Sequence, residues 1–240
     1  MSIDLSLSSG ELLNIKVKRS TRCKHIQLKA NIYGIHVVAP VNYDFQSITR
    51  FIHSRMEWIS KVHKYYAKFV EKFGQDSDPS GNFLTYLGSV YKLQIVNDRR
   101  SYNIVSNNLK VITFHVNDRR KYKREIISWY KRTTSKIIFQ RLPLLSTKLD
   151  LKYNRVLVKS QKSRWGSCSK NKNLNFNLLL SALPSEVVDY VIIHELIHLV
   201  EFNHSKRFWD LVKTHDPDYS YHRKVLRRYS CLTNLFWYIP

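Results

Sequence analysis

The first part of the chain is marked by short segments in which hydrophobic and polar residues alternate. Residues 12–18, 25–29 and 35–39 show the period of two that is typical of half-buried strands. Gly34 and Pro40 bound the last of these segments and predict a hairpin with the segment before it. Three more strands are expected at 83–87, 91–96 and 109–114, after a polar loop at 74–82.

Two long segments carry hydrophobic residues at helical spacing instead. Residues 45–72 have them from Ile48 to Tyr66, and Asp44 is placed to cap that helix. Residues 118–145 also follow a helical period, with lysine and arginine on the other face, and Pro143 is expected to disrupt the end.

The last third combines both patterns. Strands are expected at 155–160 and 174–180 around a polar turn, and an apolar segment then runs to residue 200 with Ser185 as its expected cap. We therefore predict an α+β fold with two domains. Residues 1–115 would form an N-terminal β-rich module with a long helix, and residues 116–240 an α+β catalytic lobe.

The composition is that of an ordinary soluble protein, with 43% hydrophobic and 24% charged residues among 240. The chain holds no run of about 18 apolar residues, so no membrane contact is expected. The opening Met1 to Asp4 does not resemble a secretory signal. Three widely spaced cysteines, Cys23, Cys168 and Cys231, predict reduced thiols and a cytoplasmic location.

The net charge is +22, with a pI of about 10. Such a surface attracts polyanions through counterion release, so a nucleotide or nucleic acid is one candidate partner. The charge is spread along the chain, however, and a lysine-rich coding bias that fills solvated faces is the simpler interpretation.

The segment His194-Glu195-Leu196-Ile197-His198 carries the clearest chemistry. Two histidines four residues apart on a helix project from one face, which is the spacing that a tetrahedral zinc ion requires. The surrounding residues are apolar, and an imidazole without a partner is costly to bury there. A hydrogen-bonded pair of core histidines is the alternative to a metal site.

His204 is the expected third ligand of one zinc ion. It follows His198 by six residues, about 240° away from the shared face on a continuous helix. It reaches the ion only if the chain turns back, and Asn203 is a suitable residue for ending the helix. Glu201 shares the helical face and is the alternative, either as third ligand or as an acceptor that orients a histidine ring.

A hydrolytic mechanism follows from these residue types. Three neutral imidazoles leave one coordination position for water, whose pKa zinc lowers to about 7. Glu195 would accept the proton of that water and return it to the leaving group. Arg164 and His222 are candidates for stabilising the oxyanion, and a surface or structural role is the simpler interpretation of each. Cys168 is not needed as a ligand or nucleophile.

On these motifs the chain resembles the YgjP-like metallopeptidase family, which is related to SprT-like and WLM zincins. The likeness covers nearly the whole chain and is strongest from Arg164 to Trp209. The residues that carry it there are Arg164-Trp165-Gly166-Ser167-Cys168-Ser169, Leu174-Asn175-Phe176, Asp189-Tyr190-Val191, His194-Glu195-Leu196, His198-Leu199, Glu201, Asn203-His204-Ser205 and Phe208-Trp209.

The resemblance implies a zincin-like catalytic lobe with His194, His198 and His204 as zinc ligands and Glu195 as the catalytic residue. Phe176 stands where the family usually has Trp, and Asn177 where it often has Arg. The second difference is expected to remove a charge that faces the substrate.

Three functions are therefore open. The first is a zinc metallopeptidase that acts on a peptide or protein, and the second is a metal-dependent nucleoside triphosphate pyrophosphatase, which some descriptions of the family suggest. The third is a nucleic-acid-binding protein with a structural zinc. The all-histidine ligand set favours the first over a magnesium site built from carboxylates.

Overall fold

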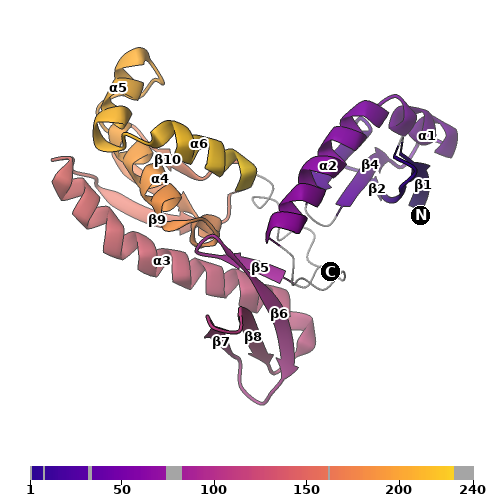
Figure 1. The fold of residues 1–240 in the computed structure, drawn as a ribbon, viewed down its shortest axis with the longest axis horizontal. Coiled ribbons are helices and arrows are strands. Elements are labelled where there is room, and N and C mark those ends of the chain that lie inside the picture. Colours follow the sequence, from indigo (N-terminus) through magenta and orange to yellow (C-terminus); the bar gives the residue numbers. More distant parts are fainter. Residues whose placement is uncertain (1, 8, 32–33, 74–82, 162, 230–240) are drawn as a thin grey trace. The chain divides into compact units, whose positions relative to one another are not determined.

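The computed structural model describes residues 2–7, 9–31, 34–73, 83–161 and 163–229. The fold is α+β, as the sequence predicts, with helices and short sheets in both parts of the chain (Figure 1). The chain divides into two compact units, residues 1–75 and 76–240. Within the described residues, no helix combines the length and the apolar character that crossing a membrane requires.

The first unit is one sheet with two helices on one face. The strands pair in the order β1-β2-β4-β3, with β2 and β4 parallel and the other pairs antiparallel. The inward residues of the strands pack with Ile48, Ile52 and Ile59 of the helices in a core that contains only hydrophobic side chains. The elements are β1 (Ser2–Ser6), β2 (Leu12–Ser20), β3 (Gln27–Asn31), β4 (Gly34–Pro40), α1 (Phe45–His53) and α2 (Met56–Phe73).

The predicted hairpin is present as β3 and β4, but the single helix expected at 45–72 is wrong. The structure has two helices separated at Ser54 and Arg55. The apolar positions keep their helical spacing across this break, so the pattern did not reveal it. Asp44 caps α1 as predicted, because its Oδ1 accepts a hydrogen bond of 2.6 Å from the Ser47 amide. The loop expected at 74–82 lies outside the described residues.

The second unit contains two sheets and the remaining helices. The first sheet has the order β5-β6-β8-β7 and the second has the order β10-β11-β9. Its elements are β5 (Phe83–Tyr86), β6 (Ser89–Asn97), β7 (Tyr102–Ser106), β8 (Val111–Val116), η1 (Arg119–Lys121), α3 (Tyr122–Lys148), β9 (Arg155–Lys159), β10 (Gly166–Cys168), β11 (Asn173–Asn177), η2 (Leu178–Ala182), α4 (Ser185–Ile197), α5 (Lys206–His215) and α6 (Tyr219–Arg228).

Helix α3 does not end at Pro143, contrary to the sequence prediction. It continues to Lys148. The proline ring lacks the N–H that would bond to the carbonyl of Phe139. Pro143 and Phe139 are both exposed, so water can satisfy that carbonyl and the helix tolerates the proline.

Two further boundaries differ from expectation. The strand expected at 174–180 ends at Asn177, where the chain turns into the short 3₁₀ helix η2. Ser185 is the first residue of α4 and not its cap, since Pro184 holds the cap position without a side-chain hydrogen bond. Strands β1, β7 and β10 and helix α6 were not predicted.

The sheet β5–β8 is attached directly to the start of α4. The amides of Leu87 and Gly88, in the β5–β6 turn, donate to the carbonyls of Ser181 (2.8 Å) and Ala182 (3.1 Å) in η2. A Cβ at Gly88 would lie 2.8 Å from the ring of Pro184. Residues 83–115, which were expected in the first domain, thus belong to the compact unit of α4, and the boundary at 115–116 stays a prediction.

Candidate metal centre

Helix α4 is a buried apolar helix into which polar residues are inserted at its C-terminal end. Tyr190, Ile192 and Leu196 are at most 3% exposed. His194 lies on this helix and His198 is its C-cap residue, with its amide bonded to the His194 carbonyl at 3.3 Å. Because other helices and strands surround α4, the two imidazoles are held on a rigid element.

The helix ends earlier than predicted. The sequence analysis placed its end near Asn203, but α4 stops at Ile197 and residues 198–200 form a turn. None of the described residues from 198 to 205 has a positive φ, so the reversal needs no left-handed residue. The amides of Val200 and Glu201 both donate to the Ile197 carbonyl, and this tight turn redirects the chain toward His204.

The turn brings the three predicted histidines together. Their candidate ligand nitrogens all lie within 4.8 Å of one another, and the Nε2 atoms of His194 and His204 are 3.1 Å apart. His198 presents its Nδ1 to the backbone carbonyl of Glu201 at 3.0 Å, which leaves its Nε2 for the cluster. Glu201 therefore orients a ring through its main chain, and its carboxylate is not part of the described three-residue group.

Helix α5 supplies the packing behind this cluster. Phe208 is fully buried, and its ring centroid lies 4.6 to 4.9 Å from those of all three imidazoles. Trp209 stacks on His204, with centroids 5.6 Å apart and planes at 26°, and Arg223 of α6 covers the Trp209 ring at 4.6 Å. His204 is exposed and lies outside any helix, so this stack limits the motion of its ring.

The carboxyl group of Glu195 is buried beside the histidines. Glu195 is 5% exposed, and its Oε2 has no hydrogen-bond partner among the described residues. Burial raises its pKa to about 8, although the positive charge of Arg164 lowers it. Strand β10 packs closely against this carboxyl group, since a Cβ added at Gly166 would lie 2.5 Å from the Glu195 Oε1. Only glycine leaves room for the carboxyl there.

The three histidines fit a zinc ion. With Zn–N bonds of about 2.0–2.1 Å, two nitrogens of a tetrahedral site are about 3.3–3.4 Å apart, close to the 3.1 Å found between His194 and His204. Burial, followed by the neighbouring His198 and His204, lowers the pKa of His194 to about 3. Its imidazole is thus neutral at pH 7, as a metal ligand must be.

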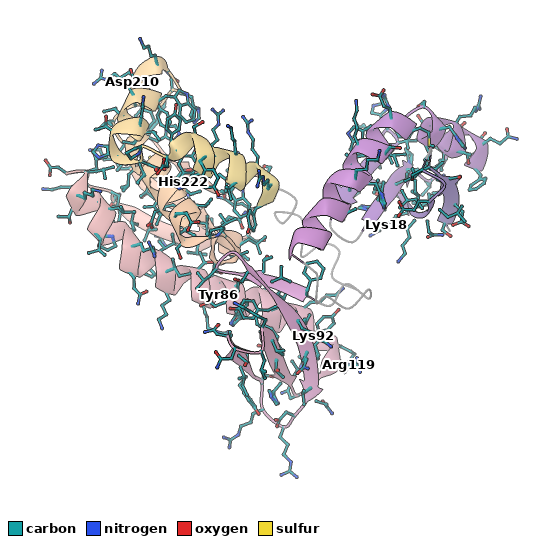
Figure 2. All side chains as sticks on the ribbon, in the orientation of Figure 1. Lys18, Tyr86, Lys92, Arg119, Asp210 and His222 are labelled. Atoms are coloured by element: carbon teal, nitrogen blue, oxygen red, sulfur yellow. The ribbon has the colours of Figure 1, made fainter. Side chains whose placement is uncertain are left out.

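The other candidate residues have different surroundings. The His222 Nδ1 lies 2.8 Å from Asp216, and both side chains are largely buried. Figure 2 shows His222 on α6. That pair uses the Nδ1 of His222 and fixes the orientation of its ring, so the role of His222 at an oxyanion stays a prediction. Arg164 is exposed and acts on Glu195 through its charge. Burial raises the pKa of Cys168 to about 11, which keeps it a thiol and a poor nucleophile.

Asn177 has a structural role, so the expectation that it replaces a substrate-facing charge is wrong. The side chain is 1% exposed, and its amide donates to the carbonyls of Gln161 (2.8 Å) and Arg164 (2.9 Å). The main-chain amide of Asn177 donates to the backbone carbonyl of Trp165 at 2.8 Å. Asn177 therefore fixes the segment that leads into β10 and places Gly166 against Glu195.

The sequence predicted tight packing of residues 165–169 near the site, but not the contacts that Gly166, Trp209 and Arg223 make there. Gly166 stood inside a motif that carried the family resemblance, but only the packing of β10 on α4 explains why a glycine is required. Arg223 belonged to a run of basic residues that was interpreted only as spread surface charge. Its contact with Trp209 depends on α6, a helix that was not predicted.

A buried helix that carries HExxH, with a third histidine returned beside it, is an arrangement typical of metal-dependent peptidases. The chain belongs to the YgjP-like family, since the model for "YgjP-like, metallopeptidase domain" matches residues 24–229. No curated protein is detectably similar to the chain in sequence. The match extends across both compact units and includes every residue of the histidine cluster.

Proposed function

We propose that this protein is a zinc-dependent peptidase in which His194, His198 and His204 hold one ion and Glu195 moves the proton. The single observation that supports this most strongly is the convergence of three imidazoles within 4.8 Å beside a buried carboxyl group. Zinc in this position supplies a Lewis acid for the scissile carbonyl and acidifies water.

Glu195 would serve first as general base and then as general acid. It follows His194 directly, so the helix that holds two ligands also holds the proton acceptor. A pKa raised toward neutrality makes both protonation states accessible near pH 7, which suits a group that must accept a proton and then release it. The charge of Arg164 favours the anionic form, which is the one needed for the first step.

The substrate is best accommodated along β10. This strand lies at the edge of its sheet and pairs only with β11 among the described strands. Its first residue, Gly166, is in contact with Glu195. An extended peptide that paired with the free edge of β10 would bring its backbone carbonyls to the metal centre through main-chain hydrogen bonds. Such recognition depends little on the side chains of the substrate.

The alternatives derive less support from the site. A pyrophosphatase that uses magnesium needs oxygen ligands, whereas the described cluster offers imidazoles alone. A structural zinc is usually closed by four protein ligands, and three are gathered here. Both alternatives are therefore kept as outcomes of the experiment.

The test compares the wild-type protein with Glu195→Gln and His198→Ala after purification with zinc. Unfolded casein is the first substrate, and a panel of nucleoside triphosphates is the second. We expect casein cleavage by the wild type alone, about one zinc per chain in the wild type and in Glu195→Gln, and little zinc in His198→Ala.

Equal casein cleavage by the wild type and by Glu195→Gln would contradict the peptidase assignment. Release of pyrophosphate that is lost in His198→Ala would replace it with the pyrophosphatase. Stoichiometric zinc without either activity would favour the structural role.

A further inference from the structure

The outer face of the sheet β5–β8 is uncovered in the described part of the chain. Alternate residues of β6 and β8, such as Leu93 and Phe114, are buried on the side of α3. The opposite side of the sheet carries Val96 (40% exposed), Tyr102 (46%) and Ile104 (52%). The register places Tyr102 opposite His115 and Ile104 opposite Thr113, so these side chains share one face.

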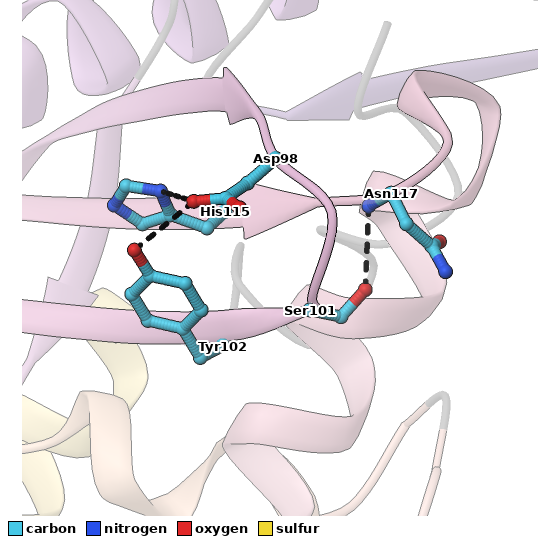
Figure 3. Close-up of polar contacts among 5 residues, drawn as sticks. All are labelled: Asp98, Ser101, Tyr102, His115 and Asn117. Carbon is cyan, nitrogen blue, oxygen red and sulfur yellow. Dashed lines mark hydrogen bonds and ion pairs between the residues drawn. The ribbon is translucent and has the colours of Figure 1, made fainter.

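One aromatic ring on this face is held rigidly. Tyr102 stacks on His115 with centroids 4.1 Å apart and planes at 7°. Asp98 ties both rings, because its Oδ2 accepts from the Tyr102 hydroxyl at 3.1 Å and lies 3.0 Å from the His115 Nδ1 (Figure 3). The Tyr102 side chain is thus preorganised while almost half of it stays open to solvent.

Basic residues gather at the same end of the sheet. Strands β6 and β8 are parallel and β7 is antiparallel to β8, so the segments 98–101 and 117–121 both lie beside Tyr102. The Asn117 amide joins them by donating to the Ser101 Oγ at 3.4 Å (Figure 3). Arg99, Arg100 and Arg119 are exposed, and none of the three forms an ion pair among the described residues.

The two acidic groups of this region are already compensated. Asp118 forms an ion pair with Arg120 at 3.0 Å. Asp98 accepts from Tyr102 and from the backbone amides of Arg99 and Arg100, which holds its pKa below the ordinary value. A shallow hollow lined by Asn97, Asp98, Arg99 and Asn117 adjoins this end. The charged side chains that a ligand can reach at this end of the sheet are therefore mainly the arginines, so the surface is positive.

We propose that this face binds single-stranded nucleic acid, with a base stacked on Tyr102 and the phosphate backbone beside Arg99, Arg100 and Arg119. Stacking on an exposed aromatic ring next to cationic side chains is how proteins hold unpaired strands without reading their sequence. Duplex DNA keeps its bases stacked inside the helix and cannot offer one to Tyr102. An acidic peptide matches the charge but offers no flat base for the ring.

The experiment measures fluorescence anisotropy of a labelled 12-nucleotide oligothymidylate and a 12-nucleotide oligouridylate with the full-length protein. A 12-base-pair duplex and polyglutamate are the competitors. We expect both single strands to bind, with affinity that falls as salt rises, and both competitors to bind at least tenfold more weakly. Tyr102→Ala should weaken single-strand binding about tenfold, whereas Tyr102→Phe, which keeps the ring, should stay within about threefold of the wild type.

Charge is tested separately from stacking. Arg99→Gln with Arg100→Gln should weaken binding and reduce the slope of log affinity against log salt by about 1.4, at about 0.7 per phosphate contact. The matched control, Lys16→Gln with Lys18→Gln, removes the same charge from exposed lysines of the first unit and should leave that slope nearly unchanged. Circular dichroism and melting temperature establish that each variant is folded.

Equal losses in the two double variants would overturn the proposal, because binding would then follow net charge alone. It would also be overturned by equal or tighter binding of the duplex or of polyglutamate, or by no effect of Tyr102→Ala. His198→Ala should bind the strands normally, so this result is independent of the peptidase assignment.

Discussion

The two compact units differ in what they bury. The core of the first unit is made of aliphatic side chains on alternating strand positions and on two helices. All six polar or charged residues that are buried among the described residues belong to the second unit: Thr85, Thr134, Asn177, Ser181, Glu195 and Asp216. Most of them are satisfied, for example Thr134, whose hydroxyl contacts Ser181 at 2.9 Å.

Glu195 is the exception that matters for function. Its Oε2 lacks a hydrogen-bond partner among the described residues, and burial raises its pKa. The fold thus holds an acid where a hydrophobic residue would be more stable. A buried carboxyl group kept at a cost in stability indicates a site selected for chemistry. The first unit shows no comparable group in its described core.

The largest effect is expected from Glu195→Gln, which tests whether this cost is functional. Loss of a general base lowers kcat about 10²–10⁴-fold. The raised pKa means that the folded metal-free protein binds a proton more tightly than the unfolded chain, so the free energy of unfolding falls as pH rises from about 4.5 to about 8. Glu195→Gln should abolish this decrease in the free energy of unfolding, because glutamine does not titrate. Peptidase assays and chemical denaturation of the metal-free protein at pH 5 and pH 8 measure the two effects.

An unchanged kcat in Glu195→Gln would contradict the role of Glu195 as general base. An identical pH dependence of stability in the wild type and Glu195→Gln would contradict the raised pKa of Glu195. His215→Gln, a change elsewhere in the same unit, serves as the control for a generic effect of substitution.

The next effect is expected from Gly166→Ala. The new Cβ would collide with the Glu195 carboxyl and displace it, while the histidines are not in its path. We expect kcat to fall about 10–100-fold with zinc content unchanged, since small misplacements of a catalytic group cost about 10²-fold. Ser167→Ala, the next residue on β10, is the control and should keep most of the activity. Equal activity of Gly166→Ala and the wild type would show that β10 does not set the position of Glu195.

The comparison of the units also explains which features were predictable. Alternation identified β2, β3 and β4, and the HExxH spacing identified His194 and His198, because both depend on local periodicity. His204 lies off that helical face and was predicted only on the assumption that the chain turns back. The break in the helix at Ser54 was hidden because the apolar period continues across it.

Features that depend on contacts between distant segments were not predictable. Gly166 is required by a side chain 29 residues later, and Asn177 acts through carbonyls of the preceding loop. Helix α6 has so many charged residues that its sequence was interpreted only as a surface. Nothing local indicates that Arg223 covers Trp209.

A smaller effect is expected from Trp209→Leu. The side chain holds the ring of His204, the only one of the three histidines that is exposed and outside α4. Second-sphere partners of this kind change metal affinity by about 10–100-fold. We expect the lower end because Trp209 stacks on His204 alone and lies farther from His194, with ring centroids 6.0 Å apart. Competition with a chelator measures the zinc affinity. Trp58→Leu, at a partly exposed tryptophan of the first unit, is the matched control. Equal zinc affinities would show that the stack does not position His204.

The smallest effect is expected in the first unit, at His36. Burial and the nearby Lys29 and Lys18 lower its pKa to about 4 (Figure 2 shows Lys18). His36 therefore binds a proton more readily in the unfolded chain than in the folded protein. Its contribution to the free energy of unfolding is fully present above about pH 6.5 and is lost as pH falls toward 4. After allowance for solvent screening of this half-buried group, the loss is about 1 kcal/mol.

His36→Gln should abolish that loss, and His25→Gln, at an exposed histidine nearby, should not. Denaturation at pH 4 and pH 7 measures it. The same pH dependence in the wild type and His36→Gln would contradict the predicted linkage.

The most direct test of the account is anomalous diffraction at the zinc edge from crystals of the wild-type protein grown with zinc. We expect one zinc ion, bound by the Nε2 atoms of His194, His198 and His204 at about 2.0–2.1 Å, with Glu195 beside it and not bound to it. A peak ligated by Cys168 or by the Glu201 carboxylate, or no peak among these histidines, would contradict it.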